Sequence, residues 1–272
     1  MPSPWDMTGK VVVITGGNAG IGLGFARGIA RAGGDVVIWG RRQDKNEEAA
    51  AQLAAEFGVK ALPQAVDVSD EARVIEAMAQ AVQEMGRVDG VIANAGVMQP
   101  VKSFLELTGE AYHRLLAINQ HGAFYAAREA ARHMKARWDE GDTSGGSILF
   151  CASLSALTGS PGMQHYNAAK GAIASMARGI AVDMGKYGVR ANTVCPGYTV
   201  SETVIDQGPD SPLGKRVREG TPIPRFGTAE DFEGVGVYFM SDASRFHTGD
   251  LVKIDGGWMA NAGKSNILAG RG

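Results

Sequence analysis

Short apolar runs alternate with longer amphipathic segments along most of the chain. The short runs are rich in Val and Ile, and the longer segments are rich in Ala, Glu and Arg, as strands and helices respectively tend to be. The predicted strands are Lys10–Thr15, Asp35–Trp39, Lys60–Val66, Val88–Ala93, Ser147–Cys151, Val189–Cys195 and Leu251–Ile254. The predicted helices are Ile21–Ala32, Asp44–Phe57, Asp70–Met85, Gly109–Trp138, His165–Tyr187 and Ala229–Ser241.

This alternation of strand and helix predicts parallel strands joined by crossover helices. The strands are nearly continuous in apolar residues, which is typical of a sheet covered on both faces. We therefore predict the α/β class, with residues 1–272 forming a single dinucleotide-binding and catalytic domain. Its architecture would be a Rossmann-type doubly wound sheet of about seven parallel strands with helices on both faces.

Two segments break the alternation. Trp138–Gly146 is polar and rich in turn residues, so we expect a loop. Thr199–Gly227 carries four prolines and little periodicity, and it follows the end of a strand, where ligands bind in open α/β sheets. We predict that residues 199–227 form a substrate lid. Residues 260–272 are small and polar, and we expect a loosely held C-terminal tail or a contact with another subunit.

Composition narrows the classes of partner. The formal net charge is -2 and no long run of like charge occurs, so a nucleic-acid partner is not favoured. No apolar run reaches the length of a membrane span, and the N-terminus has no basic region followed by an apolar stretch. The two cysteines, Cys151 and Cys195, each end an apolar run and are expected to be buried and reduced. We expect a cytoplasmic protein with no membrane partner and, lacking a cluster with metal-ligand spacing, no catalytic metal.

A glycine-rich stretch follows the first predicted strand and opens the first predicted helix. Glycines let the backbone approach a pyrophosphate, and a helix N-terminus presents free N–H groups to it. The spacing matches neither G-x-G-x-x-G nor a Walker loop. A turn that only packs the helix on the strand is the alternative. The candidate cofactor-binding residues here are Gly16, Asn18, Gly20, Ile21 and Gly22.

The end of the second predicted strand bears on cofactor choice. In a dinucleotide fold this end faces the adenine ribose, where an acid favours NAD and a guanidinium favours NADP. The chain has Gly40 where an acid could stand, followed by Arg41 and Arg42. The charges therefore favour NADP(H), with NAD(H) as the alternative. A solvated pair of arginines at a helix start would look the same in the sequence.

Tyr166 and Lys170 lie four residues apart in a predicted helix, and Ser153 lies upstream. Side chains four residues apart on a helix share a face. A positive charge held beside a phenol favours the phenolate, which makes the pair a candidate proton donor and acceptor at neutral pH. Taken alone, the pair is more often amphipathic packing and the serine more often a cap or turn residue.

Several motifs occur in a fixed order along the chain: Thr-Gly-Gly-Asn-Ala-Gly-Ile-Gly at 15–22, Asn-Ala-Gly at 94–96, the residues Asn119, Ser153, Tyr166 and Lys170, Pro-Gly at 196–197, and Ile-Asp-Gly-Gly at 254–257. Together these motifs resemble those of the classical short-chain dehydrogenase/reductase family over about residues 8–258. The resemblance implies an oxidoreductase that transfers a hydride between a nicotinamide cofactor and a carbonyl or alcohol.

The resemblance also implies roles for four catalytic residues. Tyr166 would exchange a proton with the substrate oxygen, and Lys170 would make the phenol more acidic and bind the nicotinamide ribose. Ser153 would polarise the substrate oxygen, in preference to the neighbouring Ser155. Asn119 would hold a water in a proton relay that reaches Lys170. The alternative for Asn119 is a polar residue that interrupts its helix.

Further cofactor contacts follow from the resemblance. Asp67 and Val68 would meet the adenine, and Asn94 would hold the central strand and line the cleft. The family usually has Thr at the position of Ser201, so the hydroxyl is kept while the residue differs. The remaining implied contacts are Ala95, Gly96, Pro196, Gly197 and Thr199, together with Tyr166 and Lys170 themselves.

The favoured function is an NADP(H)-dependent alcohol dehydrogenase or carbonyl reductase acting on a small molecule. The alternatives are an NAD-dependent sugar or polyol dehydrogenase and a cofactor-binding scaffold without catalysis. Substrate identity stays open, with Gln99, Ser155–Met163, Tyr198 and the lid as the expected pocket. His121 and His165 are expected to be packing or rim residues. The resemblance also implies a homotetramer built on the two longest predicted helices.

Overall fold

Seven parallel strands form one sheet in the computed structural model, which describes residues 3–200 and 210–261. Their order across the sheet is β3-β2-β1-β4-β5-β6-β7, and every pair of neighbouring strands is parallel. The sheet confirms the predicted fold class. In chain order the strands are β1 (Val11–Thr15), β2 (Asp35–Gly40), β3 (Ala61–Ala65), β4 (Gly90–Ala93), β5 (Gly146–Cys151), β6 (Val189–Pro196) and β7 (Leu251–Ile254).

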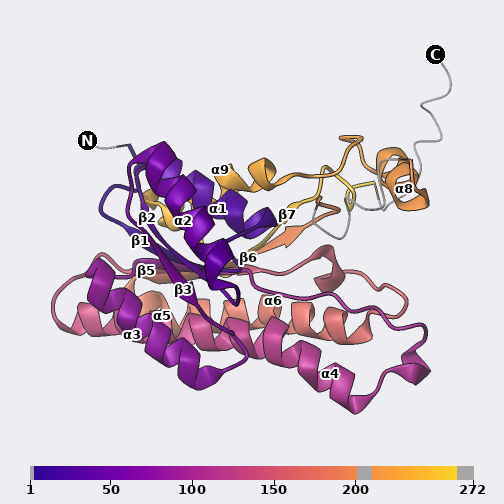
Figure 1. Cartoon of the computed structure of the whole chain (residues 1–272), viewed down its shortest axis with the longest axis horizontal. Coiled ribbons are helices and arrows are strands. Elements are labelled where there is room, and N and C mark those ends of the chain that lie inside the picture. The colour runs from indigo at the N-terminus through magenta and orange to yellow at the C-terminus, as the bar shows by residue number, and fades with distance from the viewer. Residues whose placement is uncertain (1–2, 201–209, 262–272) are drawn as a thin grey trace.

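Helices cover both faces of the sheet (Figure 1). Helices α1, α2 and α9 lie on one face, and α3, α4, α5 and α6 lie on the other. The α-helices are α1 (Gly20–Arg31), α2 (Gln43–Phe57), α3 (Glu71–Met85), α4 (Gly109–Leu116), α5 (Gly122–Asp139), α6 (Gln164–Met184), α8 (Pro212–Gly220) and α9 (Glu233–Met240).

Strand β1 shows why the strands read as continuous apolar runs. All five of its residues are buried. Val11 and Val13 belong to the hydrophobic cluster beneath α3, α5 and α6, whereas Val12 and Ile14 belong to the cluster beneath α1 and α9. Successive side chains of a strand point to opposite faces, so both sets must be apolar when helices cover both faces.

The predicted helix Gly109–Trp138 is interrupted by a π-helical segment at Ala117–His121, between α4 and α5. A π turn accommodates one more residue than an α turn, and such turns are frequent at functional sites. The backbone stays helical throughout, so apolar periodicity alone did not reveal the change. Asn119 lies in the middle of this π segment and is fully buried.

The prediction of little regular structure in Thr199–Gly227 was wrong in part, because Pro212–Gly220 forms helix α8. Ser211 is its N-cap and accepts a hydrogen bond from the Gly214 backbone N–H at 3.0 Å. Proline at the first helical position favours a helix start, since its missing N–H would have no partner there anyway. The prolines and the lack of periodicity indicated an irregular segment, whereas Pro212 begins a helix.

Other boundaries differ in detail. The predicted helix Ala229–Ser241 begins as a 3-10 turn, η5 (Ala229–Phe232), before α9. Within residues 3–200 and 210–261, no helix is both long and apolar enough to cross a membrane.

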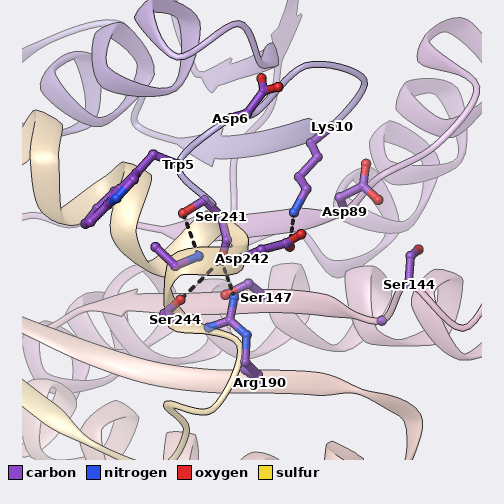
Figure 2. Close-up of polar contacts among 12 residues, drawn as sticks. Trp5, Asp6, Lys10, Asp89, Ser144, Ser147, Arg190, Ser241, Asp242 and Ser244 are labelled. Atoms are coloured by element: carbon purple, nitrogen blue, oxygen red, sulfur yellow. Dashed lines mark hydrogen bonds and ion pairs between the residues drawn. The ribbon is translucent and has the colours of Figure 1, made fainter. Parts of the chain in front are cut away.

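Charged and hydroxyl side chains gather at the edge of the sheet where the strands begin (Figure 2). Lys10 points toward Asp242 and forms an ion pair with it. Asp89 accepts hydrogen bonds from the Val11 backbone N–H at 2.9 Å and from Arg137 Nη1 at 3.0 Å. We call this part of the molecule the amino edge, and the opposite part, where the strands end, the carboxyl edge.

Candidate active site

A cavity of about 580 Å³ opens at the carboxyl edge, where the chain leaves β1, β2, β3 and β4. Strand β1 lies between β2 and β4, so the sheet's strand order reverses direction at this point. Ligands of open α/β sheets bind at such a switch point. The cavity wall includes several predicted cofactor residues, namely Gly16, Asn18, Asp67, Val68, Ala95 and Gly96.

The glycine loop between β1 and α1 is shaped for close backbone approach. A Cβ atom on Gly22 would lie 2.0 Å from the Gly16 carbonyl oxygen, so only glycine fits there. Gly20 and Ile21 are the first two residues of α1. The N-cap residue, Ala19, makes no side-chain cap and the first turn carries no acid. The free N–H groups and partial positive charge of the helix N-terminus therefore stay available to an anion.

Asn94 fastens the glycine loop to the end of β4. Its side-chain Nδ2 donates to the Thr15 carbonyl at 3.1 Å and to the Gly16 carbonyl at 3.3 Å. The Thr15 hydroxyl in turn accepts from the backbone N–H groups of Asn94 and Ala95, both at 2.9 Å. Four hydrogen bonds thus hold the two loops that flank the cavity in a fixed relation.

Charged groups flank the end of the cavity beyond β2 and β3. Arg41 and Arg42 both line it, and Arg41 is exposed and makes no hydrogen bond or ion pair with residues 3–200 or 210–261. The Asp67 carboxylate accepts from the Ser69 hydroxyl at 2.7 Å and the Ser69 N–H at 2.9 Å. The Ser69 hydrogen bonds and the charge of Arg41 hold the pKa of Asp67 below its ordinary value.

Tyr166 and Lys170 lie one turn apart on α6, as predicted. Lys170 is buried, and its Nζ donates to the Cys151 carbonyl at the end of β5 at 2.8 Å. The same nitrogen lies 5.7 Å from the centroid of the Tyr166 ring. No carboxylate among the described residues forms an ion pair with Lys170. A buried ammonium without a counter-ion is costly to hold.

Asn119 packs next to Lys170 behind the cavity wall. A Cβ atom on Gly96 would lie 3.4 Å from both Asn119 Oδ1 and Lys170 Nζ. The Asn119 amide is already engaged, because Oδ1 accepts from the Val97 N–H and Nδ2 donates to the Val97 carbonyl, each at 2.8 Å. Asn119 thus joins the π turn to the loop after β4.

Ser153 follows β5 and caps the short 3-10 turn η3 (Leu154–Ala156). Its hydroxyl oxygen accepts from the Ser155 N–H at 3.2 Å, which leaves the hydroxyl proton free to donate. The Ser153 backbone N–H approaches the thiol of Cys195 on the neighbouring strand, where burial raises the pKa of that thiol. Both cysteines are free and buried, and burial raises the pKa of Cys151 to about 11.

The remaining predicted contacts lie toward the predicted lid. Pro196 ends β6, and the Gly197 N–H donates to the Ile254 carbonyl at 2.9 Å. Thr199 lies beside a second cavity, of about 310 Å³, rather than the cavity of about 580 Å³. Ser201 and the predicted tail beyond 261 lie outside the described residues.

The two histidines named from the sequence differ in burial. His165 is buried, and its Nε2 lies 3.0 Å from the Gln99 carbonyl, so it packs α6 against the loop after β4. His121 is exposed. The described residues contain no group of three or more His, Cys, Asp or Glu side chains that could hold a metal ion.

One residue that contacts the cavity wall from behind was missed by the sequence analysis. Asn46 of α2 is fully buried and binds Asn18 through a side-chain hydrogen bond of 2.6 Å. The signal was present, because Asn46, Ala49, Ala50 and Leu53 form the buried stripe of α2. An asparagine at an apolar position of such a stripe indicates a specific hydrogen-bonding role.

A family model described as enoyl-(acyl carrier protein) reductase matches residues 16–259. Sorbose reductase sou1 of Schizosaccharomyces pombe is 35% identical over 261 residues, covering 95% of this chain and 99% of that protein. L-rhamnose 1-dehydrogenase (NAD(P)(+)) of a Sphingomonas species is 32% identical over 255 residues, covering 94% and 98%.

Solved structures agree with these relatives. The NADPH-dependent 3-quinuclidinone reductase from Rhodotorula rubra is similar with a TM-score of 0.86 and 33% identity, covering 96% of each chain. Similarity of this kind covers nearly the whole chain.

Proposed function

The chain belongs to the classical short-chain dehydrogenase/reductase family, and on that premise we propose that it transfers a hydride between NADP(H) and a carbonyl or secondary alcohol, with Tyr166 as general acid/base. The relatives are dehydrogenases and reductases of sugars and alcohols, and the chain is an NAD(P)-dependent oxidoreductase that acts on CH–OH groups. We propose the preference for NADP(H), the class of substrate and the roles of the individual site residues.

The observation that carries the proposal is the buried ammonium of Lys170, one turn from Tyr166 and directly behind Gly96 of the cavity wall. A bound nicotinamide would supply or accept the hydride. As a carbonyl is reduced, negative charge develops on its oxygen, and the site must supply a proton and stabilise that charge. The Lys170 charge favours the phenolate that remains after Tyr166 gives up its proton.

Ser153 and Asn119 complete the proposed machinery. The free proton of the Ser153 hydroxyl would donate to the substrate oxygen and polarise it. The Asn119 amide is held by Val97 on both sides, so we assign the relay water to main-chain atoms of the π turn rather than to this amide. Asn119 would then fix the π turn beside Lys170.

The cavity fits a dinucleotide. The absence of a side chain at Gly22 and the uncapped start of α1 suit a pyrophosphate. Asp67, Val68, Ala95 and Gly96 line the path from the adenine end toward Lys170. These features support binding by the chain's own backbone and side chains without a metal ligand cluster.

The preference for the phosphorylated cofactor is supported by charge. Arg41 stands after β2 with no partner among the described residues, and Gly40 leaves no acid to receive a ribose 2'-hydroxyl. A guanidinium pairs bidentately with phosphate. NAD(H) is the alternative, and it would leave the Arg41 charge unused.

The names of the relatives favour a polyhydroxylated substrate, such as a sugar or polyol, over an apolar ketone. In this chain Gln99 accepts a hydrogen bond from Arg114 at 3.3 Å, so polar groups stand at the loop expected to face the substrate. This observation keeps a sugar or polyol dehydrogenase as the second candidate within the same chemistry.

The test is a panel of sugars, polyols, ketones and secondary alcohols assayed in both directions with NADPH and NADH, following absorbance of the reduced nicotinamide. We expect turnover with NADPH on at least one polyol or its carbonyl partner. Binding of NADPH, seen as a fluorescence change, without turnover on any member would contradict the enzyme assignment and favour a cofactor-binding scaffold.

A further inference from the structure

Asn46 is a buried amide whose orientation the surrounding backbone determines. Its Nδ2 donates to the carbonyls of Gly40 and Gln64, both at 2.9 Å. Carbonyl oxygens only accept, so the amide nitrogen must face them and Oδ1 must face the opposite way. Oδ1 accepts from Asn18 Nδ2 at 2.6 Å, which fixes the Asn18 amide in turn.

Asn18 is therefore held with its nitrogen turned toward Asn46. Its Oδ1 accepts no hydrogen bond from residues 3–200 or 210–261. Asn18 lines the large cavity, whereas Asn46 does not. Asn46, which lies outside the cavity, thus determines that Asn18 offers its Oδ1 as a hydrogen-bond acceptor to a ribose hydroxyl.

The same two amides close position 40 to any side chain. A Cβ atom on Gly40 would lie 2.5 Å from Asn18 Nδ2 and 2.5 Å from Asn46 Oδ1. Position 40 is the end of β2, where an acid would receive the ribose hydroxyls of NAD. The amide pair occupies the space in which that acid would have to begin.

We propose that Asn46 is a positioning residue for cofactor selection. Acting through Asn18, it keeps position 40 without a side chain and presents Asn18 Oδ1 to the ribose hydroxyl that the 2'-phosphate leaves free. The phosphate is left to Arg41 at the rim. This inference rests on the proposed preference for NADP(H).

The test measures dissociation constants for NADPH and NADH by nicotinamide fluorescence, together with the thermal midpoint, for four proteins. These are the wild type, Asn46→Ala, Gly40→Asp and the double variant Gly40→Asp/Asn46→Ala. Ala50→Gly is the matched control, because Ala50 is buried on the same helix and the change weakens α2 without reaching Asn18.

We expect Asn46→Ala to weaken both cofactors about fivefold, the effect of one lost oriented hydrogen bond to a hydroxyl that both cofactors keep. Ala50→Gly should lower the thermal midpoint by a comparable amount and leave both cofactor dissociation constants unchanged. If Asn46→Ala left both cofactor affinities unchanged, or if Ala50→Gly lost as much cofactor affinity as Asn46→Ala, the proposal that Asn46 orients Asn18 would be wrong.

We expect Gly40→Asp alone to fold poorly or to bind both cofactors weakly. In the double variant the carboxylate gains room, repels the 2'-phosphate and accepts from the NAD ribose, so the ratio of NADH to NADPH affinity should rise at least about tenfold. Two results would contradict the proposal that Asn46 keeps position 40 free of a side chain. The first is a Gly40→Asp protein that already prefers NADH. The second is a double variant that is no better folded and no more selective than Gly40→Asp.

Failure of this inference is distinguishable from failure of the proposed function. A wild-type protein that binds NADH more tightly than NADPH contradicts the cofactor preference itself, before any variant is made. Variants that do not behave as described, in a wild type that prefers NADPH, contradict the role of Asn46 alone.

Discussion

The two edges of the sheet use polar residues in opposite ways. At the amino edge, Asp89 accepts hydrogen bonds from the Val11 N–H, Arg87 and Arg137. The Phe239 carbonyl accepts hydrogen bonds from Ser147 and Arg190, both at 2.7 Å. At the carboxyl edge the described structure leaves donors unused: the first turn of α1, the Arg41 guanidinium and the Ser153 hydroxyl.

The contrast separates stability from function. A polar group that is paired inside the protein contributes to folding and has little left for a ligand. The pairing at the amino edge is extensive although Arg137 Nε and Arg190 Nη1 have no partner among the described residues. A group held in place without a partner costs stability and becomes available for binding or catalysis. Changes at the amino edge should therefore affect unfolding, and changes at the carboxyl edge should affect chemistry and cofactor affinity.

The largest effect is expected from Tyr166→Phe. Removing the proton donor should lower kcat by about 10²- to 10⁴-fold, the usual contribution of a general acid or base. The thermal midpoint and the NADPH dissociation constant should stay near the wild-type values. Tyr187→Phe is the control, since Tyr187 packs edge-to-face against Trp138 away from the cleft. Full activity in Tyr166→Phe would contradict the mechanism.

The second effect tests the amino edge. Asp89→Asn removes the shared carboxylate of two arginines and leaves the buried Arg137 charge with Asp142 as its remaining carboxylate partner, so the free energy of unfolding should fall by about 1–3 kcal/mol. Urea denaturation measures the loss, and NADPH affinity of the folded protein should not change.

Asp242→Asn is the matched control for that loss. The Asp242 side chain is 69% exposed in its pair with Lys10, so the change should cost no more than about 1 kcal/mol. Equal losses of unfolding free energy in the two variants would mean that burial of the amino-edge network contributes nothing to stability. That result would contradict the contrast between the two edges.

The third effect tests the guanidinium of Arg41. Arg41→Ala should raise the Michaelis constant for NADPH by about 10- to 100-fold through loss of charge-assisted hydrogen bonds to phosphate, and hardly affect NADH. Lys45→Ala removes a nearby exposed cation that is already paired with Glu48 and should affect neither cofactor. The same rise for NADH and NADPH would remove the basis for the 2'-phosphate role.

The smallest effect comes from a carboxylate that is paired although it lies at the carboxyl edge. Hydrogen bonding to Arg225 lowers the pKa of Asp231 from 3.8 to about 2. The folded-state pKa is below the unfolded one, so the stabilisation is present above pH ~4 and is lost as the pH falls toward 2.

Thermal midpoints between pH 5 and pH 2 measure that dependence. Because the Arg225 side chain is 54% exposed, Asp231→Asn should cost about 0–1 kcal/mol at pH 5. The variant should lose less stability than the wild type on acidification. Parallel curves for the two proteins would show that another group titrates.

The sequence predicted the sheet and the helix that carries Tyr166 and Lys170 well. Strand β7 was predicted with its observed bounds, and Tyr166 and Lys170 lie on α6 as expected. These features depend on local periodicity and on spacing within one helix, which the chain shows directly. The family resemblance added the order of motifs, and the comparisons confirm the family.

Three features depended on contacts that a sequence does not display. The π turn around Asn119 keeps an apolar rhythm close to that of an α-helix, and α8 was hidden by prolines that turned out to favour its start. The Asn18–Asn46 pair joins a loop to a helix twenty-eight residues later, and only the fold brings them together. The engagement of the Asn119 amide by Val97 is equally non-local.

The π turn also makes the site sensitive to the count of residues. A π turn holds one more residue than an α turn, so deleting one residue from Ala117–His121 would leave a continuous α-helix with α4 and α5 in nearly the same phase. Ala126 and Ala130 of α5 would stay buried against the sheet. The residue presented beside Lys170 would change, because the bulge that carries Asn119 would be gone. The position of Asn119 beside Lys170 is thus a property of chain length as much as of residue type.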